Sequence, residues 1–367
     1  MVQILILTTA IFLLISLVVI IINFFTAPLL KNLTDDQQHT GKKISVLIPA
    51  RNEEHNIGKC LAYVLNQDVN IYEIIVLDDQ SSDNTKNIVS DIAAEHSNLK
   101  LVDGEPLPKN WIGKTWACEQ LGRIAKGDLL LFIDADVEMK PRAVRSALHL
   151  LNKYEPVMLS CFPTQKLKYF GEWMIVPLMN WLLLSFLPLK SVYSSKNNSL
   201  AAANGQFILV DRKTYINMGS HERVSSQIVE DMELIRNYKS AGLKVMTVLG
   251  NNTVYCRMYN SFSDAFNGFS KNFFTGFRIS ATGFIILILV LFTIYFVPYI
   301  FVFMDVRFLW LVLIIILSRI VISVLSNQSV LLNLLLHPLQ ILIMLLTGIY
   351  SVIVNKRKRI VWKERPL

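Results

Sequence analysis

The chain has 367 residues, of which 53% are hydrophobic and only 17% are charged. This composition leaves less polar surface than an ordinary soluble protein needs, and together with the length it indicates a membrane protein with one main folded domain and attached elements. The formal net charge is +8, but the basic residues form no stripe, so we expect no nucleic-acid partner. The densest basic run, at 356–359, directly follows an apolar segment. We interpret the run and the tail that contains it (356–367) as a topological anchor attracted to anionic lipid.

The four cysteines lie far apart in the sequence, without the spacing of a zinc site or a disulfide framework, which fits a reducing compartment. They are Cys60, Cys118, Cys161 and Cys256.

The N-terminal segment is almost entirely apolar from Ile4 to Phe25, the ~20 residues that cross a bilayer as a helix. No Lys or Arg precedes it, and no small-residue cleavage site follows before the apolar run ends. We therefore predict a retained membrane anchor over residues 1–30.

A polar linker at 31–42 is followed by short β-branched and apolar runs that alternate with helical stretches. Three of these runs, at 44–48, 74–77 and 129–133, are apolar except for Ser45, which is typical of parallel strands buried on both faces. The pattern predicts a doubly wound α/β domain over residues 31–280.

Polar side chains follow each predicted strand, where ligands of such sheets bind. We expect these residues to form a site: Pro49, Glu53, Asp78, Asp79, Asp134 and Asp136.

Asp78 and Asp79 follow the second strand. A carboxylate there can accept hydrogen bonds from ribose hydroxyls or a base N–H. The alternative is a turn in which Asp83 or Asn84 caps a helix that starts near Thr85. Both interpretations can hold, on different residues.

Asp134 and Asp136 are two residues apart and follow five apolar strand residues. Paired carboxylates suit hard, oxygen-bound cations such as Mg²⁺ or Mn²⁺, held together with substrate phosphates. Asp-x-Asp also occurs by chance in many loops, but its place after a buried strand aims both carboxylates at the crevice.

Two further elements precede the C-terminal region. Residues 173–190 are apolar but contain two prolines and carry tryptophans, so we predict an interfacial helix, with a buried core helix as the alternative.

Glu230 and Asp231 begin a helical stretch, where the helix dipole favours carboxylates. From the residues alone, helix capping is the simplest role for Asp231.

Three more apolar stretches, at about 283–304, 308–326 and 330–354, predict C-terminal membrane helices within 281–355. If all three cross and the catalytic domain is cytoplasmic, the basic tail lies outside, against the positive-inside tendency. We therefore expect one irregular segment, either the second with Arg319 or the third with His337-Pro338.

The ordered motifs at 49–54, 78–83, 134–136 and 230–231 resemble family 2 glycosyltransferases of the GT-A fold, over roughly residues 43–279. The resemblance implies a nucleotide-sugar donor, with UDP-glucose expected, and a divalent metal ion, Mg²⁺ or Mn²⁺. It implies that Asp79 lies near the nucleoside, that Asp136 and Asp134 lie on the metal and diphosphate, and that Asp231, with Glu230 beside it, is the catalytic base. Such a base would take the acceptor's proton during inverting transfer.

A narrower likeness, over residues 107–117, is to glycosyltransferases of bacterial carotenoid and hopanoid gene sets. Here Lys114 opens a helix and is our candidate for the donor diphosphate; a solvated surface lysine is the alternative. The likeness extends to residues that would line or seal an acceptor tunnel at the membrane: 203–206, 257–259, 268–272, 337–338 and 361–363.

The sequence Gln-x-x-Arg-Trp, associated with processive synthases, does not follow Asp231, so a single transfer is favoured. The first hypothesis is a cytoplasmic-face membrane enzyme that joins glucose to a carotenoid acid of the diaponeurosporenoate type. The second keeps the enzyme but replaces the lipid-like acceptor with a glycerolipid, a polyprenyl phosphate or a hopanoid. The third is a non-catalytic membrane protein that only binds nucleotide sugar.

Overall fold

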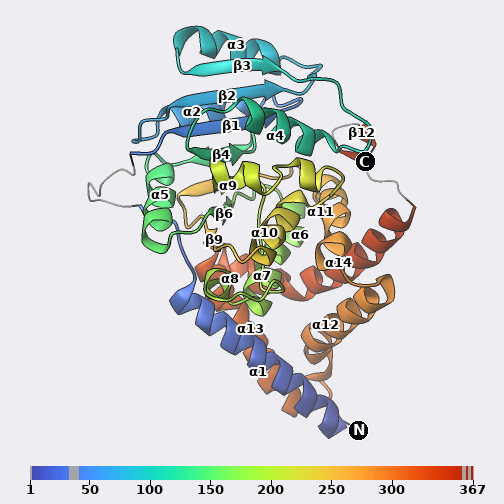
Figure 1. Cartoon of the computed structure of the whole chain (residues 1–367). Helices are drawn as coiled ribbons and strands as arrows, with labels where there is room; N and C mark the ends of the chain where they lie inside the picture. Colours follow the sequence, from blue (N-terminus) through green and yellow to red (C-terminus); the bar gives the residue numbers. More distant parts are fainter. Residues whose placement is uncertain (1, 33–40, 358–360, 363–364, 367) are drawn as a thin grey trace. The chain divides into compact units, whose positions relative to one another are not determined.

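A computed structural model describes residues 2–32, 41–357, 361–362 and 365–366. Its contacts divide the chain into two compact units (Figure 1). The first, here called the apolar unit, comprises Met1–Ala27, Gln165–Ser191 and Met258–Ile360; the second, the sheet unit, comprises Pro28–Thr164, Val192–Arg257 and Val361–Leu367. The segments 165–191 and 258–280, within the predicted catalytic domain of 31–280, thus pack with the apolar helices.

The sheet unit is built on a seven-stranded sheet with the order β3-β2-β1-β4-β8-β6-β9. The three strands predicted from sequence form β1, β2 and β4, and all three are buried along their whole length apart from one residue. The strands are β1 (Ile44–Ala50), β2 (Glu73–Asp78), β3 (Leu99–Asp103), β4 (Leu129–Ile133), β6 (Met158–Phe162), β8 (Phe207–Asp211) and β9 (Val245–Leu249).

The expectation of a parallel sheet is correct for every strand of this sheet except β8. β8 pairs antiparallel with both β4 and β6, while β1, β2, β3 and β4 pair in parallel, as do β6 and β9. β8 is as apolar as its neighbours because it too is buried on both faces, so composition did not reveal its direction. The reversal places the start of β8 beside the carboxyl end of β4, with Phe207 opposite Ile133.

Helices cover both faces of the sheet. Alternate residues of the strands form one core cluster with α2, α3 and α5, whereas α4 contacts β1 and β2 without joining that cluster. The helices of this unit are α2 (Ile57–Leu65), α3 (Thr85–Glu95), α4 (Gly113–Ile124), α5 (Ala143–Tyr154), α9 (Arg212–Asn217), η1 (Glu222–Val224) and α10 (Glu230–Ser240); α8 (Leu189–Ser194) contains the change of unit along the chain. A three-stranded sheet has the order β5-β10-β7, with β5 at Val137–Met139, β7 at Thr164–Gln165 and β10 at Val254–Cys256. A two-stranded sheet pairs β11 (Val361–Trp362) with β12 (Arg365–Pro366).

The apolar unit is a bundle of helices. Among the described residues, four helical segments are long and apolar enough to cross a membrane: Val2–Thr26, Ala281–Phe301, Val306–Leu325 and Val330–Lys356. They correspond to the predicted N-terminal anchor and the three predicted C-terminal segments. The helices are α1 (Val2–Thr26), α6 (Phe170–Ile175), α7 (Pro177–Phe186), α11 (Phe262–Phe277), α12 (Ala281–Phe301), η2 (Val306–Phe308), α13 (Leu309–Leu325) and α14 (Val330–Lys356).

The predicted interfacial segment forms α6 and α7, with Pro177 at the first position of α7, where a proline costs no hydrogen bond. Within the unit, α6 packs against α11 and α14, and α7 packs against α1, α13 and α14. Trp181 of α7 is only 1% exposed. This burial agrees with the alternative of a buried helix, and the interfacial position stays a prediction.

The expected irregular C-terminal segment is not found among the described residues. α13 is continuous through Arg319, and α14 is continuous through His337 and Pro338. The basic run at 356–359 was interpreted as a topological anchor. Two of its residues, Lys358 and Arg359, lie outside the described residues.

Candidate functional site

The loops that follow β1 and β2 are tied to each other at the carboxyl ends of these strands. Arg51 Nη1 donates to the Asp79 carbonyl oxygen at 2.6 Å, and the Asn52 amide donates to Ser81 Oγ at 3.0 Å. Asn52 and Gln80 both have positive φ, at 51° and 56°. The two predicted donor-binding loops therefore form one connected rim.

Within this rim the structure decides between the two candidates for the helix cap, while the donor-binding role of Asp78 and Asp79 stays a prediction. Asp83 accepts hydrogen bonds from the Thr85 amide at 3.0 Å and from the Glu54 amide at 3.1 Å, so it caps the start of α3, while the Asn84 side chain makes no capping bond. Asp78 and Asp79 are only 5% and 2% exposed.

Asp78 uses one carboxylate oxygen to accept from the Ser81 amide at 3.2 Å, and its other oxygen is buried without a hydrogen-bond partner. Pro49, in β1, pairs with Leu77 of β2. Glu53 accepts a hydrogen bond from Asn56 Nδ2 at 2.8 Å and acts electrostatically on Asp136. The predicted residues of the first two strand ends thus belong to the same edge as the metal-binding candidates.

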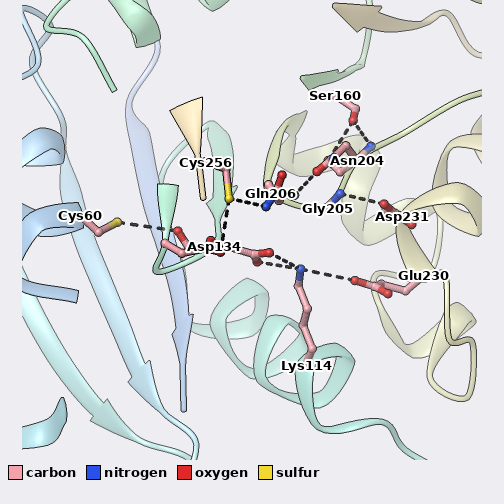
Figure 2. A network of polar contacts seen from close by, with 11 residues as sticks. Cys60, Lys114, Asp134, Ser160, Asn204, Gly205, Gln206, Glu230, Asp231 and Cys256 are labelled. Atoms are coloured by element: carbon pink, nitrogen blue, oxygen red, sulfur yellow. Dashed lines mark hydrogen bonds and ion pairs between the residues drawn. The ribbon is translucent and has the colours of Figure 1, made fainter. Parts of the chain in front are cut away.

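Lys114 makes the central ion pair of the site (Figure 2). Its Nζ lies 2.7 and 2.8 Å from the two carboxylate oxygens of Asp134 and 3.7 Å from Glu230 Oε1. Burial alone would lower the pKa of Lys114, but the charges of Asp134 and Glu230 outweigh burial and raise the pKa above its ordinary value. Lys114 is therefore a fixed cation, with a side chain 20% exposed, and not a solvated surface lysine.

Asp136 is held by a chain of side-chain hydrogen bonds. Gln206 Nε2 donates to Cys256 Sγ, and Cys256 Sγ donates to one oxygen of Asp136 at 3.3 Å. The other oxygen of Asp136 is buried without a hydrogen-bond partner. Burial, followed by the charges of Asp134 and Glu53, raises the pKa of Asp136 from 3.8 to about 7.

Asp231 lies in the first turn of α10 and accepts two backbone hydrogen bonds. The Met232 amide donates to it at 2.7 Å and the Gly205 amide, from a distant segment, at 2.8 Å. The first bond satisfies an amide of the first helical turn without being an N-cap bond, because the N-cap residue of α10 is Val229, and the second ties α10 to the segment before β8. Burial and then the charge of Glu230 raise the pKa of Asp231 from 3.8 to about 7, while Lys114 opposes the shift.

Gly205 lies where the acidic residues meet. A Cβ atom at this position would lie 3.1 Å from Lys114 Nζ and 3.4 Å from Glu230 Oε1. The Gln206 carbonyl oxygen, one residue on, accepts from the Asp134 amide at 3.2 Å. The reversed direction of β8 delivers this segment to the carboxyl end of β4.

The residues present fit a divalent cation held jointly with phosphates. Among the described residues, no group of three or more His, Cys, Asp and Glu side chains is arranged to hold a metal ion by itself. Mg²⁺ usually binds through one or two carboxylates plus substrate phosphates and water. Asp134 and the unpartnered oxygen of Asp136 are suited to that arrangement.

The sequence interpretation missed Cys256 and Gln206 as supports of Asp136. Cysteine spacing suggested no role for Cys256, because its partner Asp136 lies far away in the sequence, in the turn between β4 and β5. Gln206 stood in a segment singled out only for its likeness to related enzymes. Pairing of β10 with β5, which sets Cys256 opposite Val137, is the feature that brings the thiol to Asp136.

Comparison with known proteins agrees with this geometry. Residues 45–219 match the model of glycosyl transferase family 2. The 4,4'-diaponeurosporenoate glycosyltransferase of Staphylococcus haemolyticus (strain JCSC1435) is 30% identical over 247 residues, which cover 65% of this chain and 62% of the relative. The enzyme of the same name from Staphylococcus aureus (strain USA300) is 29% identical over 241 residues, covering 64% and 62%. The matched region thus spans less than two thirds of these relatives.

Among solved structures, the mannosyltransferase PcManGT from Pyrobaculum calidifontis, in complex with GDP-Man and Mn²⁺, has a TM-score of 0.50 at 15% identity, and the match covers 96% of this chain and 99% of that one. Structural similarity at this level of identity supports the fold. The chain therefore has the GT-A fold, and its residues 45–219 are similar to glycosyl transferase family 2.

Proposed function

We propose that the chain is a membrane-bound, inverting glycosyltransferase that moves glucose from UDP-glucose to an apolar acceptor. The observation that carries the proposal is the convergence of four carboxylates and one fixed lysine at the carboxyl edge of the sheet. They are Asp134, Asp136, Glu230, Asp231 and Lys114.

The donor would lie along the rim formed by the loops after β1 and β2. Asp78 and Asp79, with Pro49 and Glu53 beside them, would hold the nucleoside through hydrogen bonds to ribose and base. Lys114, at the N-terminus of α4, would contact the diphosphate with its positive charge and the helix dipole. A bound phosphate would then compete with Asp134 for the lysine.

Asp136 and Asp134 would hold a Mg²⁺ or Mn²⁺ ion, which stabilises the negative charge of the departing diphosphate. The Cys256 thiol donates to one oxygen of Asp136, and the other oxygen, which has no hydrogen-bond partner, would bind the ion. PcManGT is in complex with Mn²⁺, which supports the same use of a divalent ion here.

Asp231 would act as the base toward a hydroxyl acceptor. The acceptor oxygen forms a bond to the anomeric carbon as the bond from that carbon to the diphosphate oxygen breaks, and the hydroxyl proton passes to Asp231. A pKa of about 7 suits this role, because a general base works best when its pKa lies near the working pH. Glu230 supports the raised pKa through its own charge.

The acceptor that we favour is a carotenoid acid of the 4,4'-diaponeurosporenoate type, in agreement with the names of the two Staphylococcus relatives. A carboxylate acceptor attacks without a base, and the product is a glucosyl ester. A glycerolipid, a hopanoid or a polyprenyl phosphate is the alternative acceptor.

The four long apolar helices favour a multi-pass cell-membrane location, with the catalytic domain on the cytoplasmic side.

The deciding experiment measures transfer from labelled UDP-glucose by the full chain in bilayer nanodiscs, with a diapocarotenoid acid and its matching alcohol as acceptors. We expect the wild-type chain to glucosylate the acid. The side-chain oxygen of Asn can accept from a backbone amide as Asp231 does from Met232 and Gly205, so Asp231→Asn should keep the fold and donor binding. We expect it to retain activity on the acid but to lose on the order of 10²-fold in rate on the alcohol.

Equal activity of the Asn variant on both acceptors would remove Asp231 from the catalytic residues. Donor binding without transfer by the wild-type chain, to either acceptor or to lipid extracts of cells, would favour the non-catalytic hypothesis.

A further inference from the structure

A cluster of polar side chains is buried inside the apolar unit, between α13 and α14. It consists of Arg319 on α13 and of Asn333, His337 and Gln340 on α14, and each of the four is at most 1% exposed. The three α14 residues are spaced by four and three positions, so they share one face of that helix. We call these four residues the buried polar cluster.

Part of the cluster is a rigid hydrogen-bonded frame. Arg319 Nη2 donates to Asn333 Oδ1 at 3.1 Å and to Gln340 Oε1 at 2.6 Å. Gln340 Nε2 donates to the Trp173 carbonyl oxygen at 2.7 Å, and Asn333 Nδ2 donates to Ser323 Oγ at 3.0 Å. The amide groups are therefore fixed, and one end of the guanidinium is fixed with them.

The rest of the cluster is unsatisfied. Arg319 Nε and Nη1 are buried without a hydrogen-bond partner, and so are both ring nitrogens of His337. Within the described part of the chain, Arg319 makes no ion pair with a carboxylate. The charge of Arg319 acts electrostatically on His337 and on Tyr299, so the three side chains lie near one another in the bundle.

The surroundings of His337 are aromatic. The ring centroids of Trp181, Tyr295 and Tyr299 lie 6.0, 6.3 and 6.2 Å from the centroid of the imidazole. Such walls suit an apolar chain, whereas the free N–H donors suit oxygen acceptors.

An unpaired guanidinium among apolar helices is costly, and leaving its donors without acceptors adds to the cost. Neutral amide oxygens satisfy only Nη2. The arrangement lacks a negative charge, and an anion that bound there would supply both the charge and the missing acceptors.

We propose that the buried polar cluster binds the anionic oxygen head group of an apolar, long-chain molecule dissolved in the bilayer. The head group accepts hydrogen bonds from Arg319 Nε and Nη1 and from one ring nitrogen of His337, and its chain lies against the aromatic rings. A carboxylate and a phosphate share this chemistry. The proposal concerns binding in the apolar unit and does not depend on glycosyl transfer.

The test uses the purified full chain in a neutral detergent and follows its melting temperature as an amphiphile is added, because a ligand that binds the folded state stabilises it. The probes are oleate, dioleoyl phosphatidate and the uncharged oleyl alcohol. The variant is Arg319→Met, which keeps much of the side-chain volume without the charge. The matched control is Arg307→Met, in the same unit, because Arg307 is exposed and already paired with Asp305 at 2.6 Å.

We expect an anionic probe to raise the melting temperature of the wild type and of Arg307→Met, and oleyl alcohol to have no such effect. Arg319→Met should need at least about tenfold more of the same probe for half of the effect, the loss typical of a hydrogen-bonded charge. The probe that acts at the lower concentration identifies the head group as carboxylate or phosphate.

The proposal is overturned if neither anionic probe stabilises the wild type more than oleyl alcohol does, or if Arg319→Met responds like the wild type. Should Arg319→Met fail to fold, His337→Phe tests the same site, since it removes only unpartnered nitrogens. A response of His337→Phe equal to that of the wild type would then contradict the proposal.

Discussion

The sheet unit and the apolar unit each hold a largely buried cation, and the two cations have opposite surroundings. Lys114 lies between Asp134 and Glu230, with Asp231 and Asp136 nearby. Arg319 has only the neutral oxygens of two amide side chains. The lysine is outnumbered by carboxylates, whereas the arginine has no carboxylate partner among the described residues.

This difference indicates what each site needs. Around Lys114 the net charge is negative, so binding of a further cation is favoured. A metal ion bound there and Lys114 can then both contact the diphosphate. Around Arg319 the net charge is positive, so an anion is favoured. One chain thus contains a site suited to a metal-bound diphosphate and another suited to a single anionic head group.

The largest expected effect tests the excess of carboxylates around Lys114. Asp136→Ala removes the carboxylate that has an unpartnered oxygen, so we expect transfer to fall by at least about 10³-fold, because the departing diphosphate loses its counter-charge. Initial rates over a range of Mn²⁺ concentrations measure the effect.

Asp128→Ala is a matched control, since Asp128 is an aspartate of the same unit that contacts the backbone of Lys43 and not the site. Full activity of Asp136→Ala with a chelator present would contradict the metal assignment.

The next prediction removes the cation itself. Lys114→Met should raise the KM for UDP-glucose by about 10- to 100-fold, because a charge-assisted contact to the diphosphate contributes ~1.5–3 kcal/mol. Measurement of KM and kcat for the donor separates this effect from a loss of fold.

Lys126→Met serves as the control for Lys114→Met, because Lys126 is an exposed lysine near the start of β4. An unchanged KM in Lys114→Met would show that Lys114 only neutralises Asp134 and Glu230. The conclusion that the lysine helps to bind the diphosphate would then be wrong.

Much of this site could be predicted because its residues directly follow the predicted strands in the sequence. A run of apolar residues followed by Asp134 and Asp136 needs no knowledge of distant contacts. Asp78 and Asp79 are equally local, and so is the position of Lys114 at a helix start. Their roles stay predictions, but their meeting at one edge follows from the parallel strands β1, β2 and β4.

What could not be predicted depends on contacts between distant segments. The direction of β8 determines that Gly205 reaches Asp231, and a buried strand shows the same composition in either direction. The contact between Cys256 and Asp136 joins residues 120 positions apart. Arg319 was recognised as costly, but its partners on α14 are set by helix packing that a single sequence does not reveal.

The smallest expected effect concerns the pH dependence of the rate, because the charges of Glu230 and Lys114 act in opposite directions on the pKa of Asp231. Asp231 must be ionised to accept a proton, and burial together with Glu230 raises its pKa to about 7. With an alcohol acceptor and saturating metal, the rate should therefore rise with pH and level off above about 7, and it should fall about tenfold per unit below that value. Lys114 acts against the raised pKa, so Lys114→Met should move this acid limb to higher pH. The pH profile of the residual activity of Asp231→Asn is the control, because it should lack the limb. A limb that persists in Asp231→Asn belongs to another group, and a limb that does not move in Lys114→Met would mean that the lysine's charge does not reach Asp231.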